Sequence, residues 1–376
     1  MKNLSSILAL SALMAAPAFA AGGDVKLPDT LTWTSFDVGG TGYNQSIAVG
    51  KALQDAYGIS LRVIAVSNDQ ARIAPVREGR IPFALAGSDV FFAFEGVEAY
   101  ASPEWGPQNL RAINLAGAEN CVSLGVAADA GIDTPADVKG KRVGWVVSSG
   151  SLQANVRAFL AFAGLTTDEV ELVELPGYAQ AWTAMINDQI DAMTGVTTSG
   201  VVEQAAASAR GLKWLAFPHD DQEGWHRLRD VNPHFSKRVA TVGAAFTGPL
   251  ECAGVPYPDL ITYHAEEDLV YNLTKALDAQ VGVYSKADAG TAGYAAEKQM
   301  FDWVVPYHEG AIRYYKEAGV WSDDLEAHTE SLIERAGVLA EAWKKMEGKS
   351  GEGFAEEWMK VRAEALEAAG LPVYFR

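Results

Sequence analysis

The sequence has little of what marks an enzyme or a metalloprotein. Its six histidines are scattered, and it contains neither a His-Glu-x-x-His pattern nor a Cys-x-x-Cys pair, the spacings that indicate a zinc site. It also lacks a Gly-x-Ser-x-Gly elbow, which argues against a serine hydrolase of that class. We therefore expect no catalytic residue, no metal site and no cofactor.

Positive charge is scarce as well. The chain has 30 Lys and Arg against 48 Asp and Glu, a formal net charge of -18. A charge of this sign repels nucleic acid and anionic membrane surfaces, so neither is an expected partner. A small anionic ligand is not excluded, because it responds to the local field of a cleft more than to the distant net charge.

Long apolar runs are absent except near the N-terminus. There, Lys2 is followed by an apolar stretch from Leu4 to Ala16 and by Ala18-Phe19-Ala20, a small-residue cleavage pattern. The stretch is short for a membrane span, and polar sequence follows it. We therefore predict a signal peptide over residues 1–20, a mature chain that begins at Ala21, and a periplasmic location.

Cysteine is nearly absent, since only Cys121 and Cys252 occur. In an oxidising periplasm the two could form one disulfide. They could equally be two small buried hydrophobic side chains, because the sequence does not supply the distance between them. Both interpretations stay open at this point.

What the sequence does contain is a repeated alternation of extended apolar runs and amphipathic stretches, which is typical of an α/β fold with a mostly parallel sheet. The expected strands are residues 31–36, 61–66, 83–86, 141–147, 170–174 and 191–196, with a returning strand at 257–265. The expected helices are residues 44–57, 152–163 and 267–279, followed by a helical C-terminal third. The length suits two domains of roughly 100–200 residues or one large unit.

A glycine-rich loop, Phe36-Asp37-Val38-Gly39-Gly40-Thr41-Gly42-Tyr43, joins the first expected strand to the first expected helix. Such a loop brings bare backbone N–H groups close to a ligand, and the helix behind it adds the positive end of its dipole. The glycine spacing is not that of a dinucleotide fingerprint. We therefore interpret the loop as part of an anion site.

Small polar residues recur after the expected strands in both halves of the chain. In open α/β sheets ligands lie outside the carboxyl ends of the strands, so two such halves would enclose a cleft. Any one of these residues could be an ordinary turn or cap residue, but together they favour binding of a carboxylate by neutral donors. The set is Thr41, Tyr43, Ser67, Asn68, Ser88, Ser148, Ser149, Ser151, Thr197 and Thr198.

Three larger side chains have two interpretations each. Arg72 lies one turn into the helix after Ser67-Asn68, so it could take a ligand carboxylate by two parallel hydrogen bonds or be a solvated surface residue. Tyr178 and Trp182 are four residues apart after Pro176-Gly177, so they could form an aromatic wall of the cleft or belong to the core.

The chain resembles the TAXI family of periplasmic solute-binding proteins that serve TRAP transporters. The resemblance covers nearly all of the mature chain. It rests on the loop of residues 39–43, Gly87-Ser88-Asp89, the stretch from Gly131 to Val143, the serine and glycine loop before Asn155, and the block of residues 306–319.

The resemblance implies a two-lobed, type II-like periplasmic binding protein with mostly parallel sheets, a hinge and a helical C-terminal extension. Lobe 1 would comprise residues 21–124 and 258–376, and lobe 2 residues 125–257. The lobes would close on a small carboxylate, such as glutamate or a 2-oxoglutarate-like dicarboxylate, and present it to the integral-membrane TRAP permease. We expect a monomer. The binding residues implied are Gly40, Thr41, Gly42, Tyr43, Ser88, Ser149, Gly150 and Ser151.

Two segments depart from the family pattern. Residues 67–72 carry Asp69, which disfavours a second negative group on the ligand, and Arg72, which favours one. The segment of residues 196–200 lacks the usual proline. Ligand charge therefore stays open, and the alternatives to transport are a periplasmic sensor subunit for a signalling receptor or, with less support, an enzyme.

Overall fold

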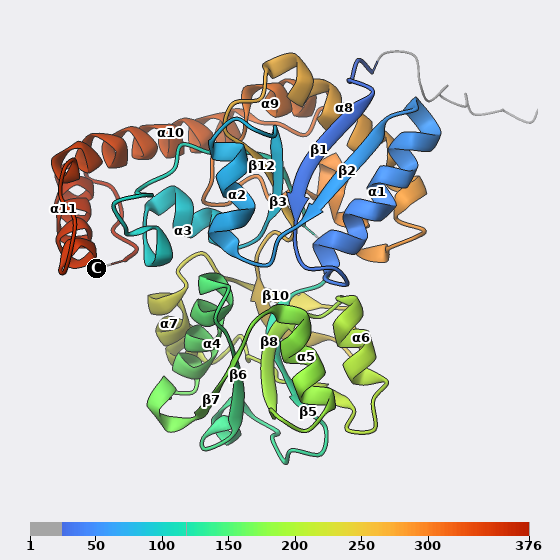
Figure 1. Cartoon of the computed structure of the whole chain (residues 1–376), viewed down its shortest axis with the longest axis vertical. Helices are drawn as coiled ribbons and strands as arrows, with labels where there is room; N and C mark the ends of the chain where they lie inside the picture. Colours follow the sequence, from blue (N-terminus) through green and yellow to red (C-terminus); the bar gives the residue numbers. More distant parts are fainter. Residues whose placement is uncertain (1–24, 118, 376) are drawn as a thin grey trace, which may run out of the picture.

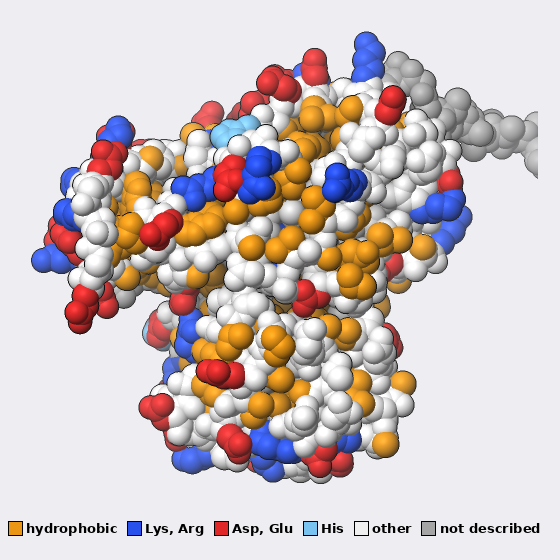
Figure 2. All heavy atoms as spheres, in the orientation of Figure 1, with side chains coloured by type: hydrophobic (Ala, Val, Ile, Leu, Met, Phe, Trp, Pro, Cys, Tyr) orange, Lys and Arg blue, Asp and Glu red, His pale blue; other side chains and the backbone are white. Residues whose placement is uncertain are grey.

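The computed structural model describes residues 25–117 and 119–375, which form two α/β lobes joined at a narrow waist (Figure 1). The signal peptide predicted over residues 1–20 lies outside the described residues. No helix within the described ranges is long and apolar enough to cross a membrane. On the face in Figure 2, acidic and basic side chains are interspersed over both lobes.

Lobe 1 is built on a five-stranded sheet of order β2-β1-β3-β12-β4. Its strands are β1 (Thr30–Ser35), β2 (Ser60–Ala65), β3 (Phe83–Ala86), β4 (Arg111–Leu115) and β12 (Asp259–Thr262). Its helices are α1 (Thr41–Tyr57), α2 (Asp69–Arg77), α3 (Asp89–Glu95), α8 (Glu267–Tyr284) and α9 (Glu309–Glu317). Two further helices, α10 (Asp323–Trp343) and α11 (Phe354–Ala368), extend from this lobe (Figure 1).

Lobe 2 is built on a sheet of order β10-β11-β5-β8-β6-β7, with β9 paired to β5. Its strands are β5 (Val122–Ala127), β6 (Arg142–Val146), β7 (Glu171–Leu175), β8 (Ala192–Val196), β9 (Leu212–Trp214), β10 (Ser236–Ala240) and β11 (Leu250–Gly254). Its helices are α4 (Gly150–Phe162), α5 (Tyr178–Ile186), α6 (Gly200–Ala206) and α7 (Gln222–Val231). Helices α4 and α7 share one buried apolar cluster, and α5 and α6 share another.

The α/β class and the two lobes agree with the expectation, but both sheets are mixed instead of mostly parallel. The parallel pairs are β1 with β2 and β3, and β6 with β7 and β8, which belong to the expected strand and helix series. The returning strands β12, β5 and β11 pair antiparallel. The reason is that a chain which passes from one lobe to the other and back enters each sheet from the opposite end.

The chain crosses between the lobes twice. The first crossing joins Leu115 of β4 to Val122 of β5, and the second joins Gly254 of β11 to Asp259 of β12. The lobe boundary expected between residues 124 and 125 therefore falls inside β5. The lobe boundary expected between residues 257 and 258 falls within the second crossing.

The helices behind the two glycine- or serine-rich loops begin earlier than expected. Helix α1 begins at Thr41, three residues before the expected start, so the glycine-rich loop already includes its first turn. It ends at Tyr57 because Gly58 adopts a positive φ of 73°, which suits glycine, and donates its N–H to the Gln54 carbonyl. Helix α4 begins at Gly150, with Ser149 as its N-cap.

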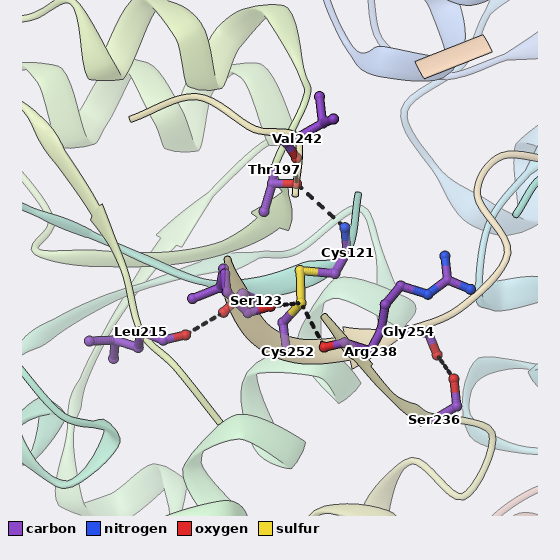
Figure 3. Close-up of a disulfide and its surroundings, with 10 residues drawn as sticks. Cys121, Ser123, Thr197, Leu215, Ser236, Arg238, Val242, Cys252 and Gly254 are labelled. Carbon is purple, nitrogen blue, oxygen red and sulfur yellow. Dashed lines mark hydrogen bonds between the residues drawn. A yellow bond between two sulfur atoms is a disulfide. The ribbon is translucent and has the colours of Figure 1, made fainter. Parts of the chain in front are cut away.

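Cys121 and Cys252 form a disulfide, which decides between the two interpretations left open by the sequence (Figure 3). Cys121 ends the first crossing, and Cys252 lies in β11, which pairs with β5 directly after the first crossing. Their Cα atoms are 6.2 Å apart. The bridge therefore fastens the end of the first crossing to β11, the strand that leads into the second crossing.

The C-terminal helices are attached to lobe 1 by a buried ion cluster. Glu95, at the end of α3, is fully buried and accepts hydrogen bonds from Arg335 of α10 at 2.6 and 2.9 Å and from Arg362 of α11. Trp358 of α11 donates its indole N–H to the Gly96 carbonyl at 2.6 Å. The extension is thus an integral part of lobe 1.

Replacing Glu95 with Gln is expected to lower the free energy of unfolding by about 3–5 kcal/mol, because two buried guanidinium groups would lose their counter-charge. Urea unfolding followed by circular dichroism measures this. Glu341→Gln on the exposed face of α10 is the control and should change stability by less than about 0.5 kcal/mol. Equal effects of the two substitutions would contradict the role of the cluster.

The double replacement of Cys121 and Cys252 with Ser should lower the free energy of unfolding by about 2–4 kcal/mol, because the bridge closes a long loop in the unfolded chain. The two residues are 131 positions apart. Urea unfolding of the variant and of the parent chain, with and without reductant, measures the effect. A titratable thiol in the denatured, unreduced parent would show that the bridge does not form.

Candidate ligand-binding cleft

A cleft of about 690 Å³, including the space open to solvent at its mouth, lies between the lobes. Both lobes and the second crossing contribute to its walls. The lining residues of lobe 1 are Phe36, Asp37, Gly40, Ser67, Asp69, Arg72, Gly87, Ser88 and Asp89. Those of lobe 2 are Val122, Val146, Ser149, Ser151, Leu152, Asn155, Tyr178, Gly195 and Val196. The second crossing supplies Tyr257.

Seven of the expected site residues line this cleft. They are Gly40, Ser67, Arg72, Ser88, Ser149, Ser151 and Tyr178. The expected residues that are not part of its lining are Thr41, Gly42, Tyr43, Asn68, Ser148, Gly150, Thr197 and Thr198. The expected loops are therefore brought together, but within each loop only some of the side chains face the cleft.

Thr197 and Thr198 support the crossing segments instead of the cleft. The Thr197 hydroxyl donates to the Val242 carbonyl at 3.1 Å and accepts from the Cys121 N–H at 3.4 Å (Figure 3). The Thr198 hydroxyl accepts from the Asn120 amide at 3.0 Å and lines a separate cavity of about 460 Å³. The position of Thr197 and Thr198 after β8 was predicted correctly, but their side chains turn toward the crossings.

Arg72 is buried in the cleft wall, 1% exposed, so the surface interpretation is wrong. Its Nη2 bonds to Asp69 Oδ1 at 2.8 Å and Asp89 Oδ1 at 3.3 Å, and its Nη1 bonds to the Val66 carbonyl at 3.2 Å. The guanidinium carbon lies 4.3 Å from the centre of the Phe36 ring. The guanidinium therefore reaches the cleft as expected, but two aspartates already balance its charge.

Two buried polar atoms of this cluster have no hydrogen-bond partner among the described residues. They are Arg72 Nε, a donor, and Asp89 Oδ2, an acceptor when the carboxyl is ionised. Asp89 Oδ1 accepts from the Gly87 N–H at 3.0 Å and from Arg72. Burial raises the pKa of Asp89 to about 7, the charge of Arg72 opposes this rise, and the charge of Asp69 adds to it.

The aromatic residues divide between the cleft and the core. Phe36 and Tyr257 pack together at 5.2 Å between ring centres, and both line the cleft. The Tyr178 hydroxyl lies 3.2 Å from the Ser199 hydroxyl, whereas Trp182 is fully buried in the core of lobe 2. The expected aromatic wall therefore includes Tyr178 but not Trp182.

The lobes touch across the cleft through residues that directly follow β2 and β6. Asp69 Oδ2 accepts from the Ser149 hydroxyl at 2.9 Å and from the Ser151 N–H at 3.0 Å. The Asn68 amide donates to the Ser148 carbonyl at 3.0 Å. Sequence reasoning noticed Asp69 as a departure from the family pattern but did not predict that it meets α4.

Asp37 and Asp89 were not predicted to be site residues. Asp89 directly follows the predicted Ser88, and Asp37 lies three residues before the predicted Gly40, so the available signal was an acidic residue inside a glycine- or serine-rich loop. Asp89 is the first residue of α3, where a carboxylate suits the helix dipole, and this common role hides its place in the cleft.

Comparison with known proteins gives one family match and several distant structures. The model of the NMT1-like family matches residues 37–319, a span that begins after β1, covers all of lobe 2 and ends before α10. The alkanesulfonate-binding protein SsuA from Xanthomonas axonopodis pv. citri, bound to MOPS, is 13% identical, with 89% of this chain and 98% of that chain covered and a TM-score of 0.44.

Two further structures are similar at the same level. The periplasmic aliphatic sulphonate-binding protein SsuA from Escherichia coli is 14% identical over 92% of this chain and 89% of that chain, with a TM-score of 0.42. An ancestral arginine-binding protein bound to arginine is 15% identical over 73% of this chain and 100% of that chain, with a TM-score of 0.40.

The raised pKa of Asp89 predicts a specific pH dependence. Because the folded state holds this proton more tightly than the unfolded state, the contribution of Asp89 to the free energy of unfolding falls as the pH rises from about 4 to about 7. Asp89→Asn cannot titrate, so the unfolding free energy of the parent minus that of the variant should fall between about pH 4 and pH 7.

Urea unfolding at several pH values measures this difference. Asp55→Asn is the control, because Asp55 lies on the exposed surface of α1, and its difference from the parent should stay constant. A parent-minus-Asp89→Asn difference that rises with pH, or that does not change, would contradict the assignment.

Proposed function

We propose that this chain, which belongs to the NMT1-like family, is the extracytoplasmic solute-binding subunit of a TRAP-type secondary transporter. It captures a small organic acid in the cleft between its lobes and delivers it unchanged to the integral-membrane permease. The observation that carries the proposal is a cleft lined by residues of both lobes, with Arg72 and Asp89, which each have one unpaired polar atom among the described residues, in its wall.

Unpaired buried polar atoms favour a ligand that pairs them. Leaving such an atom without a partner costs about 1–3 kcal/mol, so a solute that offers an acceptor to Arg72 Nε and a donor to Asp89 Oδ2 would recover that cost on binding. A carboxylate oxygen is a suitable acceptor for the arginine. A hydroxyl or a protonated group of the same solute, or the proton of the Asp89 carboxyl, would serve the aspartate.

The arrangement of the walls supports capture by closure. Residues of both lobes line the cleft, so a bound solute would contact both and favour the state in which the lobes meet. Two crossing segments connect the lobes, and such segments can absorb the change in backbone angles that closure needs. The aromatic rings of Phe36 and Tyr257 offer an apolar surface for the carbon skeleton of the solute.

The disulfide supports the proposed location. Disulfides persist in oxidising compartments such as the bacterial periplasm and are rare where thiols are kept reduced. A bridge between Cys121 and Cys252 therefore agrees with the signal peptide expected over residues 1–20. The permease as partner, the monomeric state and the choice of a dicarboxylate such as glutamate rest on the resemblance in sequence.

A thermal-shift screen of small carboxylates tests the proposal. A solute at about 100 times its dissociation constant should add about 2.7 kcal/mol to the stability of the folded chain. Ser88→Ala removes one hydroxyl from the cleft wall and should weaken binding roughly fivefold, since a neutral hydrogen bond contributes about 1 kcal/mol. Ser331→Ala on α10 is the control and should leave the affinity unchanged.

A stabilising shift with a sugar or an inorganic cation, and none with any acid, would overturn the proposed solute class. Equal weakening by Ser88→Ala and Ser331→Ala would remove the cleft as the binding site. Uptake measured in membrane vesicles with the permease present separates a transport subunit from a sensor, because only transport moves the acid across the membrane.

A further inference from the structure

The N-terminus of α4 already holds a carboxylate, and that carboxylate belongs to the protein. Asp69 Oδ2 lies 2.9 Å from the Ser149 hydroxyl and 3.0 Å from the Ser151 backbone nitrogen, and Asp69 Oδ1 lies 3.1 Å from the same hydroxyl. Ser149 is the N-cap of α4, so both donors stand at the positive end of the helix dipole.

These contacts run between the lobes. Asp69 is the first residue of α2 in lobe 1, whereas Ser149 and Ser151 follow β6 in lobe 2. The hydroxyl and backbone donors of this loop are the groups that the sequence assigned to a ligand carboxylate. In the structure, the carboxylate that they bind is supplied across the cleft by the opposite lobe.

Side chains of lobe 1 hold Asp69 in this position. Arg72, one turn later in α2, bonds to Asp69 Oδ1 at 2.8 Å, and Asp89 and the Phe36 ring hold the guanidinium in turn. Asp69 is only 6% exposed. A fixed and nearly buried carboxylate is a poor candidate for displacement by a ligand group of the same charge.

The charges that line the cleft also disfavour a second carboxylate on the ligand. The charged residues in its lining are three aspartates, Asp37, Asp69 and Asp89, and one arginine, Arg72. Arg72 is the one cation in the lining, so a second carboxylate on a ligand would meet acidic side chains without a further cation to balance it. Like charges at close range are a common means of rejecting a wrong ligand.

We infer that Asp69 is a specificity-determining residue, a built-in anion that fills the subsite at the N-terminus of α4, so that the cleft takes an acid with a single negative group in place of the dicarboxylate that the resemblance implies. The ligand's own acid group is then bound by another part of the cleft wall, in which Arg72 of lobe 1 is the one cation among the lining residues. The inference rests on the proposed function for the ligand being an organic acid.

The first test compares acids of equal length that differ by one carboxylate: succinate with butyrate, glutarate with pentanoate, and glutamate with glutamine. Calorimetric titration of the full mature chain should give a lower dissociation constant for the member with fewer carboxylates. Asp69→Asn keeps the shape but removes the charge, and it should move the ratio of the two constants by about tenfold or more toward the member with the extra carboxylate.

Asp55→Asn is the matched control, because it removes the same charge from the exposed surface of α1 and should leave the ratio unchanged. A parent chain that prefers the dicarboxylate members would overturn the inference. So would an Asp69→Asn variant with the same ratio as the parent, and in that case binding of the acids would still support the proposed function.

The second test needs no knowledge of the ligand. Asp69→Ala empties the subsite, and millimolar acetate should then restore part of the lost thermal stability, with saturation, while an equal concentration of chloride should not. The parent chain and an Asp55→Ala variant should not respond to acetate. Should Asp69→Ala fail to fold, Asp69→Ser, which keeps a short polar side chain, takes its place.

The outcomes separate the two proposals. Acetate that stabilises the parent and the variant equally, or neither, overturns the assignment of Asp69 to this subsite. Rescue of the variant alone by acetate, together with no binding of any of the tested acids by the parent chain, overturns the proposed solute class and supports the assignment of Asp69.

Discussion

The buried ion cluster of Asp69, Arg72 and Asp89 is the interaction on which the rest of the cleft depends. Asp69 and Arg72 belong to α2, Asp89 begins α3, and Asp69 also reaches the first turn of α4 in the other lobe. Buried charges are tolerated only when they are paired, because removing one partner leaves a strongly destabilising lone charge. The three side chains therefore hold two helices of lobe 1 together and hold lobe 2 against them.

The same constraint continues through α3 to the C-terminal helices. Asp89 is the first residue of this short helix and Glu95 is the last, and both carboxylates are buried. Asp89 takes part in the cleft cluster, whereas Glu95 binds Arg335 and Arg362 from α10 and α11. The C-terminal helices thus support one wall of the cleft without lining it.

Sequence reasoning located the loops of the cleft better than the side chains that face it. Strand β3 was predicted at its observed limits, and the serine-containing loops after β2, β3 and β6 do meet, because strand ends of a sheet are neighbours in any α/β fold. Asp37 and Asp89 escaped prediction although they stand in those loops, and the contact of Asp69 with α4 was not predicted either. An acidic residue in such a loop usually caps a helix, and only the packing of the lobes shows whether its side chain also lines the cleft.

The sequence by itself determined the α/β class, the two halves, the positions of the strand-end loops and the absence of recognisable catalytic motifs, since these follow from local periodicity and residue type. Tertiary structure alone decided that the two cysteines form a bridge, that Thr197 and Thr198 turn toward the crossings, and that Asp69 meets Ser149, a residue 80 positions away. The physical reason is that hydrogen bonds and ion pairs depend on distances of about 3 Å between atoms, and the folded lobes set those distances.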